Sequence, residues 1–299
     1  MPELESDSVQ VTDSPFTPAE ALPGDVQLQS SGFLLELSAD WLVLRASENV
    51  HEFLGEYHVT LIGEPLAEFV RAQPLHDLRN TISRQSGRSG IARAYRVRLT
   101  DSPRCFDLAF QLSGGKILLE GLHCADENLG AALGSVSGLI DGLVGKDRST
   151  LLENAARRIR ALTGFDCVRI STSGDGRDES AESSRAGWPA RTDPADRLNE
   201  SLILGDATAE SVCLFPRTPS DRAPEKALLR LPAREQLEPI RARGIRSLLN
   251  VPIRLDGKWA GQIECENRDP REPSFELHAA TELFAQMLAL RLEIDRLGR

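Results

Sequence analysis

Apolar and polar positions along residues 32–122 follow the period of strands, with short helical segments between them. Apolar runs bounded by turn residues predict strands at 33–38, 41–47, 94–100, 106–113 and 116–122. A two-residue turn joins the first pair and Gly114–Gly115 joins the last pair, and such short turns are typical of antiparallel hairpins. Helices are predicted at 52–54, 65–70 and 75–83. This order indicates an α+β unit in which helices cover one face of an antiparallel sheet.

The second half of the chain combines longer helices with another group of strands. Apolar residues three and four apart predict helices at 128–144, 149–162 and 274–297, with Ser149 and Ser274 as N-terminal caps. Strands are predicted at 167–171, 212–215, 246–254 and 259–267, and the Asp256–Gly257 turn joins the last two. The polar segment 172–199 is predicted to be a loop, and 226–241 a helix with a break. Helices 149–162 and 274–297 are expected to pack on the back of the second sheet.

Length and charge limit the function classes. The chain has 299 residues, which at roughly 100–200 residues per domain predicts two domains. Its formal net charge of −10 argues against a nucleic-acid or anionic-membrane partner, since both need a basic face. No apolar run approaches the roughly 18 residues of a membrane-spanning helix, and the acidic start is unlike a signal peptide. We therefore expect a cytoplasmic protein.

The sequence has few residues that could act in catalysis or bind a metal ion. The sequence holds five cysteines and five histidines, without a CxxC pair and without metal-ligand spacing. In a reducing compartment the cysteines are expected to be free thiols. Phosphate-binding glycine loops, nucleophile elbows and HExxH motifs are absent from the sequence. We therefore predict no catalytic residues and no metal site, and a protein that is not an enzyme.

Several segments together point to a family. They are LPGDVQLQSSGFLLELSADWLVLRAS, HDLRNTISRQSG, ALTGFDCVRI, RARGIRSLLNVPIRLDGKWAGQIEC and PSFELHAATELFAQMLALRLE. In this order and spacing they resemble the PAS–GAF photosensory core of bacterial phytochromes. The resemblance implies an α+β fold with a mobile tail at 1–21, a PAS domain at 22–125, a connecting helix at 126–148 and a GAF domain at 149–299. It also implies a figure-of-eight knot, in which the N-terminal segment threads a loop at roughly 195–231.

The same resemblance indicates which bilin-binding residues are missing. Phytochromes bind a linear tetrapyrrole in the GAF pocket, and bacterial members attach it to a Cys in the N-terminal tail. The matching neighbourhood here is 14–17, without a cysteine, and the first cysteine of the chain is Cys105. A thioether needs a sulfur nucleophile, so we expect that the usual covalent link cannot form.

Other pocket positions are also carried over by resemblance. The family's DIP motif is matched by TDP at 192–194, a pocket Tyr by Ser171, and the paired strand histidines by Glu266 and Asn267. The pocket positions carried over are Ser171, Asp193, Gln236, Arg246 and Asn267. Two of them keep a second interpretation. Asp193 before a proline is typical of a turn, and Arg246 could be an exposed strand residue rather than a clamp for a propionate.

Three functional hypotheses follow. The first is a phytochrome-like sensory and signal-transduction module that has lost covalent bilin binding, needs no cofactor and acts through protein–protein contacts. It is expected to form a homodimer through helices 128–144 and 274–297 and to contact an unknown signalling protein. The alternative is a photoreceptor that binds biliverdin or another tetrapyrrole non-covalently in the GAF pocket. The third is an enzyme that uses this pocket, and the absence of a nucleophile–base set argues against it.

Overall fold

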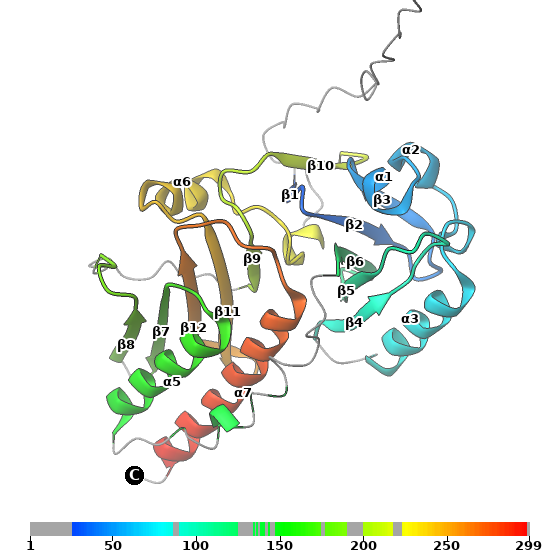
Figure 1. Cartoon of the computed structure of the whole chain (residues 1–299). Coiled ribbons are helices and arrows are strands. Elements are labelled where there is room, and N and C mark those ends of the chain that lie inside the picture. The colour runs from blue at the N-terminus through cyan, green and yellow to red at the C-terminus, as the bar shows by residue number, and fades with distance from the viewer. Residues whose placement is uncertain are drawn as a thin grey trace, which may run out of the picture.

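The computed structural model describes residues 26–85, 90–124, 134, 136, 138–140, 143, 147–174, 177–189, 200–217 and 223–297. Figure 1 shows two sheets, one in each half of the chain, with helices packed against them. The first half contains β1 (Gln27–Gln29), β2 (Gly32–Leu37), β3 (Val43–Ser47), α1 (Val50–Leu54), α2 (His58–Leu61), the 3-10 helix η1 (Leu66–Glu68), α3 (Ala72–Gln85), β4 (Ala92–Val97), β5 (Phe106–Ser113) and β6 (Lys116–His123). The second half contains α5 (Arg148–Thr163), β7 (Cys167–Gly174), β8 (Arg177–Ser184), β9 (Leu202–Leu204), β10 (Ser211–Phe215), η2 (Ala223–Lys226), α6 (Arg234–Ala242), β11 (Ser247–Leu255), β12 (Lys258–Asn267) and α7 (Phe275–Leu297).

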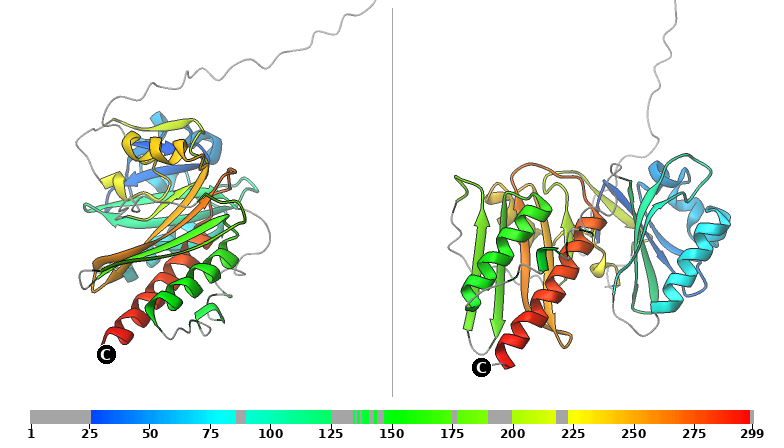
Figure 2. Two further views of the ribbon diagram at one scale, coloured as in Figure 1. Left: turned by 90° about the vertical axis from the view of Figure 1, so that its left-hand side faces the viewer. Right: turned by 60° about the horizontal axis from the view of Figure 1, so that its bottom comes forward.

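The antiparallel sheet predicted for the first half is confirmed. Its strands run in the order β1-β10-β3-β2-β6-β5-β4. Both predicted hairpins are present, because β2 pairs with β3 and β5 pairs with β6 along its whole length. Helices α1 to α3 cover one face, and the core between them includes the buried residues Phe33, Leu78 and Phe106. The other face of this sheet is turned toward α7 (Figure 2).

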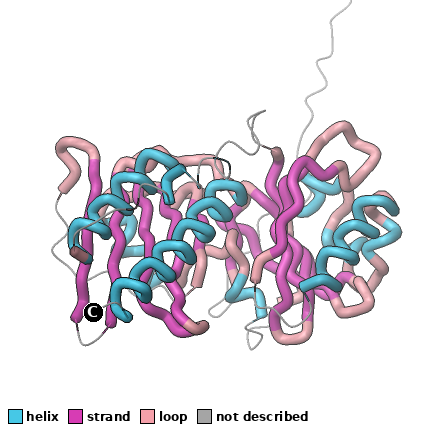
Figure 3. The backbone as a smooth tube through the Cα atoms, turned by 90° about the horizontal axis from the view of Figure 1, so that it is seen from below, coloured by secondary structure: helices cyan, strands magenta, loops and turns pink. Residues whose placement is uncertain are grey.

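The second sheet has the strand order β8-β7-β12-β11-β9. Helices α5 and α7 lie side by side across one of its faces, as the sequence predicts (Figure 3). The β11–β12 turn has φ of 49° at Asp256 and 75° at Gly257, and tight hairpin turns require such positive values. Ser274 caps α7 as predicted, because its hydroxyl accepts a hydrogen bond of 3.2 Å from the N–H of Leu277.

The loop predicted at 172–199 is wrong in its first part. Residues 177–184 form strand β8, which pairs with β7 along its full length. β8 lies at the edge of the sheet, and Ala181 is the one buried residue among those whose side chains the structure describes there. An edge strand with so little apolar surface carries no alternating pattern by which it could be recognised.

Two predictions about helices are also corrected. The helix predicted at 226–241 is reduced to α6, because the N–H groups of Leu228 and Leu229 donate to a carboxylate of the first half instead of helical carbonyls. The cap of α5 is Asp147, whose side chain accepts a hydrogen bond of 2.8 Å from the N–H of Thr150. Ser149 lies inside that helix.

Strand β10 comes from the second half but belongs to the sheet of the first. It pairs with β3 on one edge and with β1 on the other. The opposite edge of β1 meets a later stretch of the same loop, where Gln29 N donates to Leu229 O at 3.0 Å and Leu231 N donates to Gln27 O at 2.8 Å. Strand β1 therefore lies between two stretches of the predicted 195–231 loop. Residues 1–25 lie outside the described residues, so the threading itself stays a prediction.

Arg93 on β4 connects the first sheet to α7. Its Nη2 donates to Glu282 Oε2 at 2.8 Å and lies 2.6 Å from His278 Nδ1. Burial lowers the pKa of His278 well below its usual range, and the positive charge of Arg93 lowers it further. The neutral imidazole can therefore accept the hydrogen bond from Arg93. The sheet of the first half and the last helix are therefore joined by a polar contact as well as by packing.

Two predicted segments fall largely outside the described residues. They are the tail at 1–21 and most of the connecting helix at 126–148. In the latter, residues 134, 136 and 138–140 are helical.

Candidate functional site

The candidate site is the face of the second sheet that points away from α5 and α7, here called the pocket face. Side chains alternate along β11 and β12, and the residues that pack on the helices include Leu249 and Cys265. Their neighbours point the other way. Four of these neighbours are polar and no more than 5% exposed: Asn250, Gln262, Glu264 and Glu266. Buried polar groups of this kind require hydrogen-bonding or ionic partners.

Arg243 provides the positive charge for the two buried carboxylates. It follows the last residue of α6, and its Nη1 lies 2.6 Å from Glu266 Oε1. Its Nη2 lies 3.8 Å from Glu264 Oε1. Gln262 adds a hydrogen bond of 3.3 Å from Nε2 to Glu264 Oε2. The pocket face is thus cross-linked by groups of the chain itself, and we call Arg243, Gln262, Glu264 and Glu266 the ionic cluster.

A small apolar core positions the ionic cluster. It joins Leu237 and Ile240 of α6 to the edge formed by β9 and β11. Its buried members are Leu202, Leu204, Ala207, Leu237, Ile240, Ile245 and Leu248. Because the apolar side of α6 docks here, the residue after the helix reaches the acids on β12.

Arg246 precedes β11 and is bound to a carboxylate of the chain. Its Nε lies 2.7 Å from Asp206 Oδ1 and its Nη2 lies 2.5 Å from Oδ2, which is a bidentate ion pair. The hydrogen bonds from Arg246, with help from Thr208, lower the pKa of Asp206 to about 2. The guanidinium side chain is 38% exposed. An incoming anion such as a propionate would therefore compete with Asp206.

The other predicted pocket positions are distributed over the second half. Ser171 on β7 lies opposite Gln262 and so belongs to the pocket face. Gln236 is exposed on α6. Asp193 lies outside the described residues. Of these three residues, the structure places Ser171 on the same face as the buried Glu264 and Glu266.

Asn267 is buried at the end of β12, and its side chain already has two partners. Its Oδ1 accepts a hydrogen bond of 3.1 Å from Asp166 N, and its Nδ2 donates to Asp269 O at 3.1 Å. Asn267 thus ties the turn before β7 to the segment after β12.

Sequence reasoning missed Arg243, Gln262 and Glu264. The run QIECE at 262–266 alternates polar and apolar residues, which places the two glutamates on one face of a strand. That pattern could have revealed the acidic face. The pattern does not indicate that these glutamates are buried or that Arg243 neutralises them.

The five cysteines all lie among the described residues, and all are free thiols. Cys167 is opposite Glu266 on the pocket face, and burial raises the pKa of its thiol, with a further increase from the nearby carboxylates. Burial also raises the pKa of Cys265, and that of Cys124 to about 12. Because the thiolate is the reactive form, these three cysteines are poor nucleophiles.

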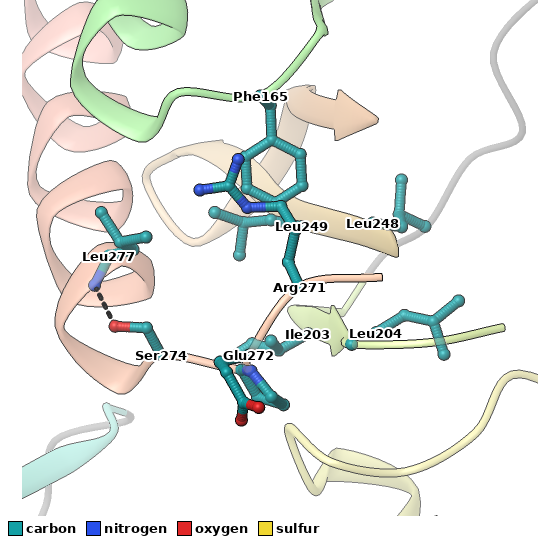
Figure 4. Close-up of a pocket in the computed structure, with 11 residues that line it drawn as sticks. Phe165, Ile203, Leu204, Leu248, Leu249, Arg271, Glu272, Ser274 and Leu277 are labelled. Carbon is teal, nitrogen blue, oxygen red and sulfur yellow. Dashed lines mark hydrogen bonds between the residues drawn. The ribbon is translucent and has the colours of Figure 1, made fainter. Parts of the chain in front are cut away.

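A small cavity lies beside the turn that ends α5 (Figure 4). Gly164 has φ of 66°, and Arg271 donates to the carbonyls of Thr163 at 3.0 Å and Gly164 at 2.7 Å. The guanidinium of Arg271 also lies 4.5 Å from the centre of the Phe165 ring. The cavity measures about 20 Å³, which suits one water molecule. This corner stabilises the end of α5 and is too small for an organic ligand.

Within the described ranges, no group of three or more His, Cys, Asp or Glu side chains is placed to hold a metal ion. None of the helices in the part of the chain that the structure describes combines the length and apolar character needed to cross a bilayer.

Family models match both halves of the chain. A PAS fold model matches residues 21–120, and a GAF domain model matches residues 147–295. No curated protein sequence matches the chain.

Solved structures match nearly the whole chain. The chromophore-binding domain of Stigmatella aurantiaca phytochrome P1 is 23% identical with a TM-score of 0.72, and the match covers 90% of this chain and 96% of that one. The chromophore-binding domain of an unusual bacteriophytochrome from R. palustris is 24% identical with a TM-score of 0.73, covering 93% and 99%. At such identities the similarity establishes the fold. The chain is therefore a PAS–GAF protein with the architecture of the bacteriophytochrome chromophore-binding core.

Proposed function

We propose that this chain is a phytochrome-like sensory and signal-transduction module that has lost covalent bilin attachment and acts through protein–protein contacts. The observation that carries the proposal is the ionic cluster on the pocket face. In a bilin-binding pocket the polar side chains serve the chromophore, whereas here Arg243, Glu264 and Glu266 satisfy one another. The sequence also has no cysteine in the N-terminal tail, and buried thiols of raised pKa are poor substitutes.

Non-covalent binding of biliverdin is the second candidate. Two observations favour it. The fold matches proteins whose names identify them as chromophore-binding domains over at least 90% of this chain. Arg246 is 38% exposed and could exchange Asp206 for a propionate. In this case the chain would still be a photoreceptor, without a thioether.

A titration with biliverdin separates the two candidates. The purified chain is mixed with biliverdin, with the Stigmatella aurantiaca chromophore-binding domain as positive control, and the absorbance is recorded before and after red light. We expect no new red-absorbing band and no rise in melting temperature. A band that photoconverts would overturn the main proposal in favour of the second candidate. Zinc-dependent fluorescence on a denaturing gel is expected to be negative in either case, and a fluorescent band would contradict the loss of covalent attachment.

The variant Asp206→Asn makes this titration sharper. It removes the carboxylate that occupies Arg246, so any binding through a propionate should become tighter. Glu153→Gln on α5 is the matched control, because it removes one exposed carboxylate far from the pocket face. If the Asp206→Asn variant also binds no biliverdin, Arg246 does not serve as a binding site for a propionate.

We further propose that the module works as a homodimer in the cytosol. Exposed apolar residues on α7 support the dimer: Leu283, Leu290 and Ile294 are 39%, 55% and 60% exposed. They recur at intervals of seven and four residues, which places them along one stripe of the helix. The five free thiols support a reducing compartment.

A further inference from the structure

We infer that a groove in the PAS half, between α3 and β4, binds a small amphipathic anion that has one acidic group on an apolar body. The two elements lie side by side at the far end of the first sheet (Figure 1). The groove measures about 430 Å³, within the range of roughly 300–1,000 Å³ that is usual for small-molecule sites. It is separate from the pocket face and does not rest on the function proposed above.

The floor of the groove is apolar. Leu78 of α3 is 2% exposed, and Ala94 and Val97 of β4 pack against the same core. These three side chains cover the interior of the PAS half at the bottom of the groove. An apolar body would be removed from water here, which favours binding.

The rim of the groove is basic. Arg71, Arg96 and Arg98 line it, and Asp77 is the one acid among its lining residues. Arg71 has a distant carboxylate partner, Asp101, at 3.8 Å, and both side chains are largely exposed. Three arginines and one acid line the groove, and Asp101 and Asp107 lie beside it; the guanidinium groups that face the groove favour an anionic ligand.

Arg96, on β4, and Arg98, just after it, are available for a ligand. Both side chains are exposed, and neither has a hydrogen-bonding or ion-pair partner among the residues that the structure describes. Planar guanidinium groups bind carboxylates and sulfonates through paired hydrogen bonds, so they suit the acidic end of the ligand.

The backbone at Arg96 is held in a special conformation. Its φ is 54°, which is uncommon for a residue other than glycine, and the pairing of β4 with β5 shifts register between Ala94 and Val97. The N–H of Arg96 donates to Asp107 Oδ1 at 2.9 Å, so a side chain replaces the missing strand partner. The resulting bulge lies at the groove. Strained positions of this kind are often found at functional sites.

Fluorescence titration with 1-anilinonaphthalene-8-sulfonate tests the inference, because this probe is an apolar ring system with one sulfonate. We expect one saturable site, displaced by decanoate but not by decyltrimethylammonium of the same chain length. Arg96→Glu/Arg98→Glu should raise the dissociation constant at least about tenfold by reversing the rim charge. Thr81→Trp should do the same by filling the groove, with no change in charge.

The control is Arg157→Glu/Arg234→Glu, which makes the same change in net charge at two exposed arginines of the GAF half. It should leave the dissociation constant within about twofold of the original. Far-ultraviolet circular dichroism and melting temperature establish that each variant is folded. Absence of saturable probe binding would overturn the inference. So would binding that survives both groove variants, as expected if the probe lies on the α7 stripe instead.

Discussion

The carboxylate of Glu120 on β6 accepts a hydrogen bond of 2.8 Å from the main-chain N–H of Leu229, in the loop of the second half. The neighbouring N–H, from Leu228, donates to its other oxygen at 3.0 Å. Glu120 is 1% exposed, and burial raises its pKa from 4.5 to about 7, although these two hydrogen bonds and the charge of Arg230 oppose the rise. One buried acid therefore holds the loop against the PAS-side sheet.

Glu120 should make the stability of the chain depend on pH. Its folded-state pKa is raised, so the folded state binds the proton more tightly than the unfolded state between pH 4.5 and about 7. The contribution to stability is complete below pH 4.5 and is lost as the pH rises through 7, by about 3 kcal/mol. Chemical denaturation from pH 4 to 8 measures it as the difference between the wild-type and Glu120→Gln profiles.

The comparison with Glu120→Gln is needed because His278 changes the stability with pH in the opposite direction. Its lowered pKa gives stability that is lost as the pH falls below 6.5. The exposed Glu153→Gln serves as control and should leave the profile unchanged. Parallel profiles for the wild type and Glu120→Gln would contradict the prediction.

Removing Arg93 should weaken the contact between the first sheet and α7. Arg93→Met leaves Glu282 and the buried His278 without their donor, and we expect a loss of about 1–3 kcal/mol in the free energy of unfolding. A double-mutant cycle with Glu282→Gln isolates the ion pair. The exposed pair Arg157–Glu153, treated in the same way, should give less than about 1 kcal/mol. Equal coupling energies for the two pairs would rule out a special role for Arg93.

Replacing Arg243 by Met should strongly lower the free energy of unfolding, although this side chain is 29% exposed. It removes the guanidinium that contacts both Glu264 and Glu266, which are 4% and 5% exposed. We expect a loss of about 3 kcal/mol in the free energy of unfolding. Arg234→Met is the control, since Arg234 is 86% exposed and its partner lies 3.8 Å away. A loss below 1 kcal/mol for Arg243→Met would mean that the ionic cluster is not energetically important.

The proposed dimer should depend on the apolar stripe of α7. Leu290→Glu/Ile294→Glu places two charges on it and should convert a dimer into a monomer, measured by light scattering during size-exclusion chromatography. Val59→Glu/Leu112→Glu introduces the same charges at exposed apolar residues of the PAS half and should leave the dimer intact. A wild-type chain that is monomeric at high concentration would refute the proposal.

Most of the fold could be predicted from sequence where apolar runs are bounded by turn residues. β5, β6, β11 and β12 are largely buried runs of this kind, and Gly-containing turns join β5 to β6 and β11 to β12. β8 could not be predicted, because an edge strand buries too little apolar surface. Residues 227–231 could not either, because their conformation is set by Glu120, more than 100 residues earlier. Long-range partners leave no local signal in the sequence.

The candidate site was less accessible to sequence reasoning for the same reason. The glutamates on β12 could be assigned to one face from their spacing. Their neutralisation by Arg243 and the pairing of Arg246 with Asp206 join residues about 20 and 40 positions apart, without any local pattern.

Strand β10 has a consequence for the order in which this protein can be completed during synthesis. The sheet of the first half lacks the strand between β1 and β3 until Phe215 has left the ribosome, so a nascent chain that already contains β2 to β6 still has an open edge at β3. The PAS half thus reaches its final form only when much of the GAF half has been made. A fragment that ends after β6 would keep this edge exposed, and the two halves are one unit for expression even though they are two domains by sequence.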